Sequence, residues 1–162
     1  MSLSDDRLKI VSRLEEMCDK WVEMRAAKEE DVKVQQRILE SPEAQTDIRE
    51  NAVYQIAKDK FSQLQLDIKN LTDKIDSFQQ FDLTKYKRTG FISIGTTVRL
   101  YLTNHQKEFV VLIVPGDLGS ARNGAVSTRS VVGEALLGKA EGDTVSVNTR
   151  VGVLSYIVKE VY

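Results

Sequence analysis

The first 89 residues contain no glycine, whereas all nine glycines of the chain lie at Gly90 or beyond. Tight turns between strands often depend on glycine, because glycine adopts positive φ angles without steric cost. A glycine-free segment of this length therefore predicts long helices, and the glycine-bearing remainder predicts a sheet with turns. The 162 residues suffice for one ordinary domain or for two small ones.

Charge follows the same division. Residues 1–83 carry 13 Lys and Arg against 18 Asp and Glu, a net charge of −5, and residues 84–162 carry 10 against 6, a net charge of +4. With 41% hydrophobic and 29% charged residues, the composition indicates a folded chain. The total charge of −1 excludes a protein that coats nucleic acid with its whole surface, but it is compatible with a local basic patch.

Neither a signal peptide nor a membrane span is expected, because the N-terminal MSLSDDRLK lacks the basic-then-apolar pattern and no apolar run is long enough. We therefore expect a cytoplasmic protein. Cys18 is the single cysteine, which excludes an internal disulfide, and His105 is the single histidine. Together they cannot form a zinc site of Cys and His ligands. Cys18 is expected to pack in a helix seam.

Apolar residues recur in the glycine-free half at alternating steps of three and four, the spacing of a coiled-coil seam. In the second part of this half they are Tyr54, Ala57, Phe61, Leu64, Ile68, Leu71, Ile75 and Phe78. The earlier part holds Val11, Leu14, Cys18, Trp21, Val32 and Leu39, with Arg25, Lys28 and Gln35 at the intervening seam positions. The two segments predict an antiparallel hairpin of helices roughly 48 Å long, at ~1.5 Å per residue.

The turn of this hairpin is expected within residues 39–51, where Pro42 interrupts the helical pattern. Two acids, Asp47 and Glu50, fall at the exposed tip. Their spacing is nearly that of a capping box, in which both carboxylates accept hydrogen bonds from free N–H groups at a helix start. Alternatively, they share a hard divalent cation such as magnesium. Two exposed carboxylates bind magnesium weakly, so no tightly bound ion is expected in the free protein.

Beyond residue 83, short β-branched runs alternate with turn residues, which is typical of a sheet. Strands are expected at residues 97–102, 109–114, 144–148 and 154–161, with minor strands at 91–94 and 125–127. A short helix is expected at residues 130–139, capped by Ser130 and ended by Gly138. The predicted fold class is α+β, with a helical hairpin at residues 1–83 and a small α+β domain at 84–162.

No catalytic set is visible in the second half. His105 lies in a polar loop without another histidine or a cysteine nearby. Gly116, Gly119 and Gly124 lack the spacing of phosphate-binding and dinucleotide-binding loops, so they are expected to serve turns. The aromatic side chains at strand positions favour a role in the core or on one sheet face over stacking on nucleic acid. These are Phe91, Tyr101, Phe109 and Tyr156.

Two motifs, one in each half, resemble a known family. The segment TDIRENAVY resembles the GDLxENAEY tip of the bacterial Gre (GreA/GreB) transcript-cleavage factors. ALLGKAEGDTVSV followed by SYIVKEVY resembles the closing pattern of the same family. The resemblance covers most of residues 43–162, and it implies an N-terminal coiled-coil hairpin joined to a C-terminal domain of FKBP-like fold.

The resemblance also implies a function as a transcription elongation factor. In the family, the C-terminal domain docks on RNA polymerase, and the hairpin enters the secondary channel and stimulates cleavage of the 3′ end of backtracked RNA. The family's tip acids fall on Asp47 and Glu50, which would hold a magnesium ion shared with the polymerase. Its tip-supporting residues fall on Asn51 and Tyr54, and its RNA-facing basic residue falls on Lys58. Arg37 and Arg49 are further candidates for the basic patch because they lie near the tip in the sequence.

Because the polymerase itself performs this hydrolysis, the resemblance implies an accessory factor rather than an enzyme. Its expected partners are RNA polymerase and, through the polymerase, the 3′ end of the nascent RNA. No cofactor is expected in the free protein. We expect a monomer that does not bind membranes.

Three residues depart from the family pattern. Thr46 replaces a glycine, Val53 replaces a glutamate, and Val131 replaces a proline. With Pro42, the changes near the tip leave open an alternative function: a Gre-like regulator that occupies the channel and modulates the polymerase without cleavage. Both tip acids are retained, which favours cleavage. A third hypothesis, prolyl isomerisation by the second domain, is disfavoured because residues 84–162 contain no tryptophan to line an aromatic pocket.

Overall fold

The computed structural model describes residues 2–42, 52–86, 89–150 and 152–162. The chain divides into two compact units. Residues 17–76 form one of them, called the hairpin unit below, and residues 1–16 together with 77–162 form the other, called the sheet unit. The boundary expected near residue 83 stays a prediction.

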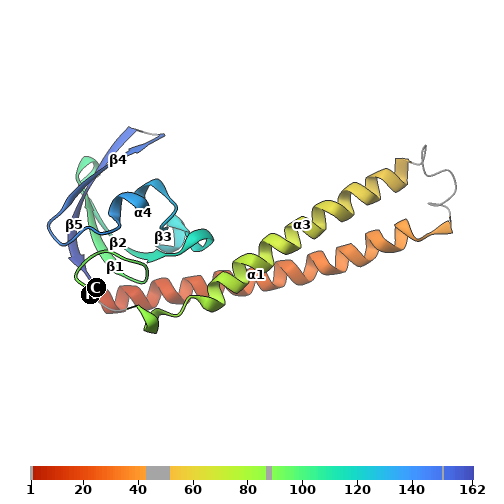
Figure 1. The fold of residues 1–162 in the computed structure, drawn as a ribbon, viewed down its shortest axis with the longest axis horizontal. Helices are drawn as coiled ribbons and strands as arrows, with labels where there is room; N and C mark the ends of the chain where they lie inside the picture. Colours follow the sequence, from red (N-terminus) through yellow and green to blue (C-terminus); the bar gives the residue numbers. More distant parts are fainter. Residues whose placement is uncertain (1, 43–51, 87–88, 151) are drawn as a thin grey trace. The chain divides into compact units, whose positions relative to one another are not determined.

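Two long helices dominate the first half, as its lack of glycine predicts. Helix α1 spans Leu3–Leu39 and helix α3 spans Ala52–Gln80. Within the hairpin unit they run side by side in opposite directions (Figure 1). Neither helix is long and apolar enough, in its described residues, to cross a membrane.

The seam between the helices matches the predicted spacing. Every seam position of the hairpin unit that the sequence predicts is buried or half-buried. The fully buried ones are Cys18, Gln35, Ala57, Leu64, Leu71 and Ile75. The predicted antiparallel helical hairpin is therefore confirmed, and the packing of Cys18 in its seam is confirmed with it.

The sheet unit contains a five-stranded sheet with the strand order β3-β2-β1-β5-β4. The strands are β1 (Thr97–Leu102), β2 (Lys107–Val114), β3 (Ala125–Ser127), β4 (Thr144–Thr149) and β5 (Gly152–Val161). Only the β2–β3 pair is parallel among these strands. Single turns of 3-10 helix lie at Leu83–Lys85, Thr103–His105, Gly116–Leu118 and Ala121–Asn123. The predicted α+β fold is confirmed.

Helix α4 (Val131–Leu136) packs on this sheet through Leu136, which is fully buried. The hydroxyl of Ser130 caps the helix by accepting a hydrogen bond from the backbone N–H of Gly133 at 3.0 Å. Gly138 follows the helix with a φ of +75°, as expected for the residue that ends it. The core around Leu136 consists of Ile92, Val98, Leu100, Val111, Ile113, Val145, Val147, Tyr156 and Val158.

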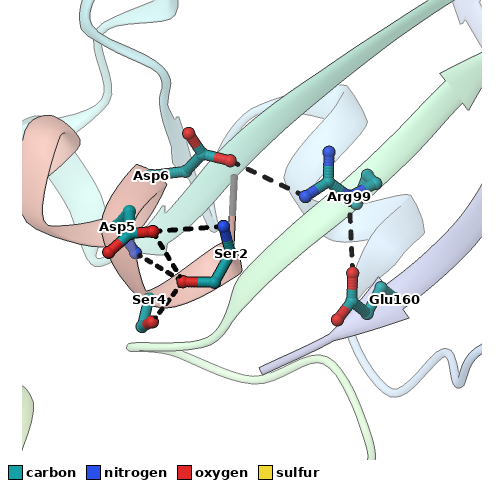
Figure 2. A network of polar contacts seen from close by, with 6 residues as sticks. All are labelled: Ser2, Ser4, Asp5, Asp6, Arg99 and Glu160. Carbon is teal, nitrogen blue, oxygen red and sulfur yellow. Dashed lines mark hydrogen bonds and ion pairs between the residues drawn. The ribbon is translucent and has the colours of Figure 1, made fainter.

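The first turns of α1 belong to the sheet unit and are held there by charged groups. Arg99 of β1 lies 3.7 Å from the carboxylate of Asp6 and 3.4 Å from that of Glu160 on β5 (Figure 2). The guanidinium of Arg7 lies 5.7 Å from the ring centroid of Tyr162, within the range of a cation–π contact. These contacts give the start of α1 one partner on β1 and one directly after β5.

The start of α1 is also capped by its own sequence. The backbone N–H of Asp5 donates to the hydroxyl of Ser2 at 3.3 Å, and the N–H of Ser2 donates to the Asp5 carboxylate at 3.2 Å (Figure 2). This reciprocal arrangement is a capping box with Asp at the acidic position. Hydrogen bonds from Ser2 hold the pKa of Asp5 below its ordinary value.

The prediction of a minor strand at residues 91–94 is wrong. Phe91 forms only an isolated bridge with Ala140, and the hydroxyl of Thr96 accepts a hydrogen bond from the N–H of Ser93, which turns the chain before β1. Phe91 is 56% exposed and belongs to no strand, so the place expected for it, in the core or on a sheet face, is wrong as well. A β-branched run between two glycines indicates extended backbone, but pairing needs a neighbour along its whole length.

Gly133 is expected to be irreplaceable inside α4. A Cβ atom at this position would overlap the carbonyl oxygen of Ser127 and lie 3.1 Å from the Ser130 hydroxyl. We expect Gly133→Ala to lower the free energy of unfolding by about 1–3 kcal/mol, because the helix must move off its cap. Urea unfolding followed by circular dichroism measures this difference.

The matched control is Glu134→Ala, at the neighbouring exposed position of the same helix. It should change the free energy of unfolding by less than about 0.5 kcal/mol. Equal losses in both variants would contradict the steric explanation.

Candidate functional site

The predicted tip lies outside the described residues. Asp47, Glu50, Asn51 and Arg49 all fall between residues 43 and 51, so the roles expected for them stay predictions. The structure describes the two helices that flank this segment, α1 up to Leu39 and α3 from Ala52. The site is therefore built below from the hairpin that presents the tip and from the sheet unit.

Two contacts across the seam define how the hairpin helices are paired. The ammonium of Lys28 on α1 lies 2.6 Å from the carboxylate of Asp67 on α3. One heptad away on each helix, the ammonium of Lys74 lies 5.8 Å from the ring centroid of Trp21. Both pairs describe one register, because a step of seven residues along α1 corresponds to a step of seven back along α3.

The Lys28–Asp67 pair is half-buried, with side chains 28% and 31% exposed. The amide of Gln63 donates a second hydrogen bond to the Asp67 carboxylate, at 2.9 Å. Hydrogen bonds from Lys28 and Gln63 hold the pKa of Asp67 below its ordinary value. Asp67 therefore gives the ammonium of Lys28 an ionic partner at a seam position where an apolar residue would otherwise be expected.

The register also places two of the predicted basic residues. Arg37 lies nine residues beyond Lys28 on α1, and Lys58 lies nine residues before Asp67 on α3. They therefore lie level with each other along the hairpin, and both side chains are exposed. The two helices bring these cations to the same height, toward the end of the hairpin where the tip acids are predicted.

Tyr54, the other predicted residue that the structure describes, lies in the first turn of α3. Its side chain is half-buried at a seam position. This placement is compatible with the tip-supporting role implied by the resemblance.

Burial raises the pKa of the Cys18 thiol, which disfavours the reactive thiolate. This agrees with a packing role in the seam. Among the described residues, no group of three or more His, Cys, Asp and Glu side chains is arranged to hold a metal ion. The magnesium expected at the tip falls on residues outside that part of the chain.

The sheet unit carries a groove of about 660 Å³. Its apolar lining comes from β1, β2, β3, α4 and β5, and includes Leu102, Phe109, Val126, Val132 and Tyr156. The rings of Phe109 and Tyr156 meet edge to face, with centroids 6.1 Å apart and an interplanar angle of 80°. Burial raises the pKa of the Tyr156 phenol above its ordinary value.

Three cationic side chains also line the groove: Arg13, Lys107 and Arg122. An apolar lining with cations beside it suits a partner that combines apolar side chains with acidic ones. We call this feature the sheet groove.

Two serine hydroxyl groups of the sheet groove, those of Ser127 and Ser130, are engaged with the backbone. Ser130 donates to the carbonyl of Ser127 at 2.7 Å, and Ser127 donates to the carbonyl of Gly116. His105 does not line the groove. The described lining therefore offers binding surface, and the hydroxyls of Ser127 and Ser130 serve local structure.

The sequence did not reveal the sheet groove. Phe109 and Tyr156 were expected in the core, and both do pack with it, but they also face the groove. The positive charge of residues 84–162 was the one available signal, because Lys107 and Arg122 contribute to it. The apolar lining leaves no separate pattern in the sequence, since the same strand positions also build a core.

The hairpin and the sheet groove together define a class of binding protein, in which a two-helix arm with exposed cations is joined to a small α+β domain. Comparison with known families identifies that class. Residues 87–162 match the family described as "Transcription elongation factor, GreA/GreB, C-term". Similar proteins include the transcription elongation factor GreA of Pseudomonas putida, 32% identical over 115 residues that cover 71% of this chain and 72% of the relative.

GreA of Vibrio cholerae is also 32% identical, over 117 residues that cover 72% of this chain and 74% of the relative. Among solved structures, the GreA factor homolog 1 (Gfh1) protein of Thermus thermophilus matches with 19% identity and a TM-score of 0.39, over 90% of this chain and 94% of that one. The chain belongs to the GreA/GreB family of transcription elongation factors.

The Asp67 carboxylate should make the stability of the hairpin depend on pH. A carboxyl with a lowered pKa stabilises the folded state above its unfolded pKa, and this contribution is lost as the pH falls through the folded value. Asp67→Asn should therefore be less stable than the parent chain near pH 7. The difference should shrink as the pH falls below about 4.

Urea unfolding at a series of pH values, followed by circular dichroism, measures this difference. Glu23→Gln, at an exposed position of α1, controls for the removal of one negative charge. A pH-independent difference between Asp67→Asn and the parent would contradict the assignment.

Proposed function

We propose that this protein binds bacterial RNA polymerase, inserts its hairpin tip into the secondary channel and stimulates cleavage of the 3′ end of backtracked RNA. The observation that carries the proposal is the hairpin itself. Its seam continues to the last turns of α1 and from the first turns of α3, and Asp47 and Glu50 fall in sequence between these two helix ends. Membership of the GreA/GreB family supports the same function.

The chemistry proposed for the tip is assistance to a hydrolysis that the polymerase performs. Magnesium supplies a Lewis acid that activates water and stabilises the charge that develops on the phosphate oxygens. Asp47 and Glu50 would add carboxylate oxygens to the ligands of such an ion and orient the attacking water by accepting hydrogen bonds from it. The water oxygen bonds to phosphorus while the bond to the upstream 3′ oxygen breaks. The chain is thus an accessory factor rather than an enzyme.

Lys58 and Arg37 are proposed to face the RNA, with Arg49 as a further member of the patch. The glycine-free half carries a net charge of −5, which repels phosphate at long range. Contact with RNA must therefore come from cations gathered locally, and the level placement of Lys58 and Arg37 provides two. Their attraction for phosphate should weaken as salt is added.

The sheet groove is proposed as the surface that docks on the polymerase. It combines an apolar lining with Arg13, Lys107 and Arg122, so the complementary surface would place an apolar side chain beside carboxylates. If the sheet unit docks on the polymerase, the hairpin tip stays available to enter the secondary channel. The protein is proposed to act as a monomer in this complex.

The assignment of the tip acids is tested with a stalled, backtracked elongation complex that carries labelled RNA. The parent chain should release a 3′ fragment. Asp47→Ala and Glu50→Ala should each lower the cleavage rate by roughly tenfold or more, because each variant lacks one of the two carboxylates proposed to bind magnesium. Asp59→Ala, an acid at an exposed position of α3, is the matched control and should cleave like the parent.

Equal cleavage by the parent and both tip variants would exclude the mechanism. Inhibition of nucleotide addition without RNA shortening would instead select the alternative function, a channel-binding regulator. The changes at Thr46 and Val53, with Pro42 nearby, are the observations that favour this alternative.

Docking through the sheet groove is tested by reversing two of its cations. The double variant Lys107→Glu, Arg122→Glu should lower affinity for core RNA polymerase by roughly tenfold at low salt, because two attractions become repulsions. Both side chains are exposed, so the fold should persist. Fluorescence anisotropy of the labelled chain measures the affinity.

The control for net charge is Lys139→Glu, Arg150→Glu, an equal reversal at exposed positions that do not line the groove. It should bind like the parent, apart from a general salt effect. Similar losses in both double variants would show that net charge, rather than the groove, governs binding.

A further inference from the structure

One row of residues along α3 carries alternating charge at heptad spacing. Lys60, Asp67 and Lys74 lie seven residues apart, and each directly precedes a seam residue. Two members of this row contact α1: Asp67 bonds to Lys28 at 2.6 Å, and Lys74 lies over Trp21 at 5.8 Å. Trp21 and Lys28 are themselves one heptad apart. We call the three residues of α3, Lys60, Asp67 and Lys74, the heptad row.

The apolar seam of α3 does not by itself select one pairing register. From residue 61 onward it repeats a pair of bulky residues in each heptad, namely Phe61 with Leu64, Ile68 with Leu71, and Ile75 with Phe78, whereas the first heptad has Tyr54 with the small Ala57. A slip of seven residues would therefore bring each apolar layer opposite another of the same kind. The apolar seam residues of α1 add little discrimination, because the polar residues Arg25, Lys28 and Gln35 interrupt them.

The heptad row distinguishes these registers clearly. In the observed register, Lys28 faces Asp67 and Trp21 faces the cation of Lys74. A slip of one heptad in either direction would bring Lys28 opposite Lys74 or opposite Lys60. Both slips exchange an ion pair for two like charges in a half-buried position, where screening by solvent is reduced.

One of the two slips carries a further penalty. When Lys28 faces Lys60, Trp21 faces the carboxylate of Asp67, and the negative face of an aromatic ring repels an anion. The alternation of charge at heptad spacing thus opposes the slips that the apolar seam tolerates. A polar seam residue with this function fixes register in coiled coils generally.

We propose that Lys28 and Asp67, assisted by Trp21 and Lys74, are positioning residues that set the register of the hairpin and so align the two sides of its tip. A slip of one heptad displaces α3 along α1 by ~10 Å. Displacements of about 1 Å already impair catalytic groups. The functional consequence rests on the proposed function, whereas the register itself is a property of the free chain.

The first test removes the charges but keeps the hairpin apolar. Lys28→Met with Asp67→Leu should fold, because replacing a half-buried ion pair by apolar residues is commonly neutral or stabilising. We expect helicity and resistance to urea at or above those of the parent, together with loss of the unique register. Spin labels on cysteines placed at Asp19 and Ser62, in a Cys18→Ala background, report the register by electron paramagnetic resonance.

These two positions are exposed, and they are offset along the hairpin by fourteen residues, or ~21 Å. A heptad slip therefore changes the axial separation of the labels by ~10 Å, in one direction or the other. The parent should show one distance, and the apolar variant should show at least one further distance. A single parental distance in the apolar variant would overturn the proposal.

The second test restores an ion pair across the hairpin but removes the alternation of charge along the heptad row. In the double variant Lys28→Asp, Asp67→Lys, the carboxylate on α1 meets an ammonium in the observed register and in both slipped registers, because Lys60 and Lys74 are retained. We expect this variant to show several label distances. If the pair only added stability, the reversed pair would restore the single parental distance, and that result would also contradict the proposal.

The matched control reverses an ion pair that does not cross the hairpin. Glu30 and Lys33 lie on α1, 2.9 Å apart and with side chains 64% and 61% exposed. Glu30→Lys with Lys33→Glu changes the same number of charges and should keep the single parental distance. A second distance in this control would show that charge reversal alone loosens the hairpin.

The link to function is tested separately, on backtracked elongation complexes. The apolar variant should cleave RNA roughly ten- to a hundredfold more slowly than the parent, while the Glu30/Lys33 control should match it. The label distances are measured without polymerase. They test the register even if the parent does not cleave, so failure of the proposed function and failure of the register proposal give different results.

Discussion

The seam between α1 and α3 is the interaction on which the hairpin depends. Within the hairpin unit the two helices bury their seam side chains against each other, so the tertiary stability of this unit comes from one narrow stripe. Ala57, Leu64, Leu71 and Ile75 supply that stripe on α3. The same narrowness explains why single polar residues matter there. A cation at Lys28 without Asp67 would face an apolar layer, with little solvent to compensate.

The two units differ in the kind of surface that they offer to a partner, and all the glycines lie in the sheet unit. The hairpin unit offers charged groups on exposed helix surface, where attraction is weak individually and acts through placement. The sheet unit offers an apolar groove with cations beside it, which suits a partner that combines apolar and acidic side chains. Under the proposed function, docking through the sheet groove and action at the tip would be altered by different substitutions.

Much of this architecture follows from patterns that the sequence displays. The three-and-four spacing identified the seam residues, and the β-branched runs identified β1 at Thr97–Leu102 and β3 at Ala125–Ser127 with their observed bounds. The failures are physical in origin. Phe91 lies in a β-branched run, yet it is exposed because pairing depends on a distant partner that local sequence does not specify. The sheet groove escaped because Phe109 and Tyr156 serve the core and the groove together. The tip residues Asp47 and Glu50 were identified by resemblance, and their roles stay predictions.

The hairpin unit is an insertion in the sheet unit, because residues 1–16 and 77–162 belong together on either side of it. An insertion of this kind can change length without disturbing its host. Each added heptad per helix contributes one more seam layer and ~10 Å of length, whereas other increments would turn the apolar stripe away from its partner. The length of such a hairpin can therefore change only in steps of one heptad per helix. Related chains could adapt to deeper or shallower binding sites only by such steps.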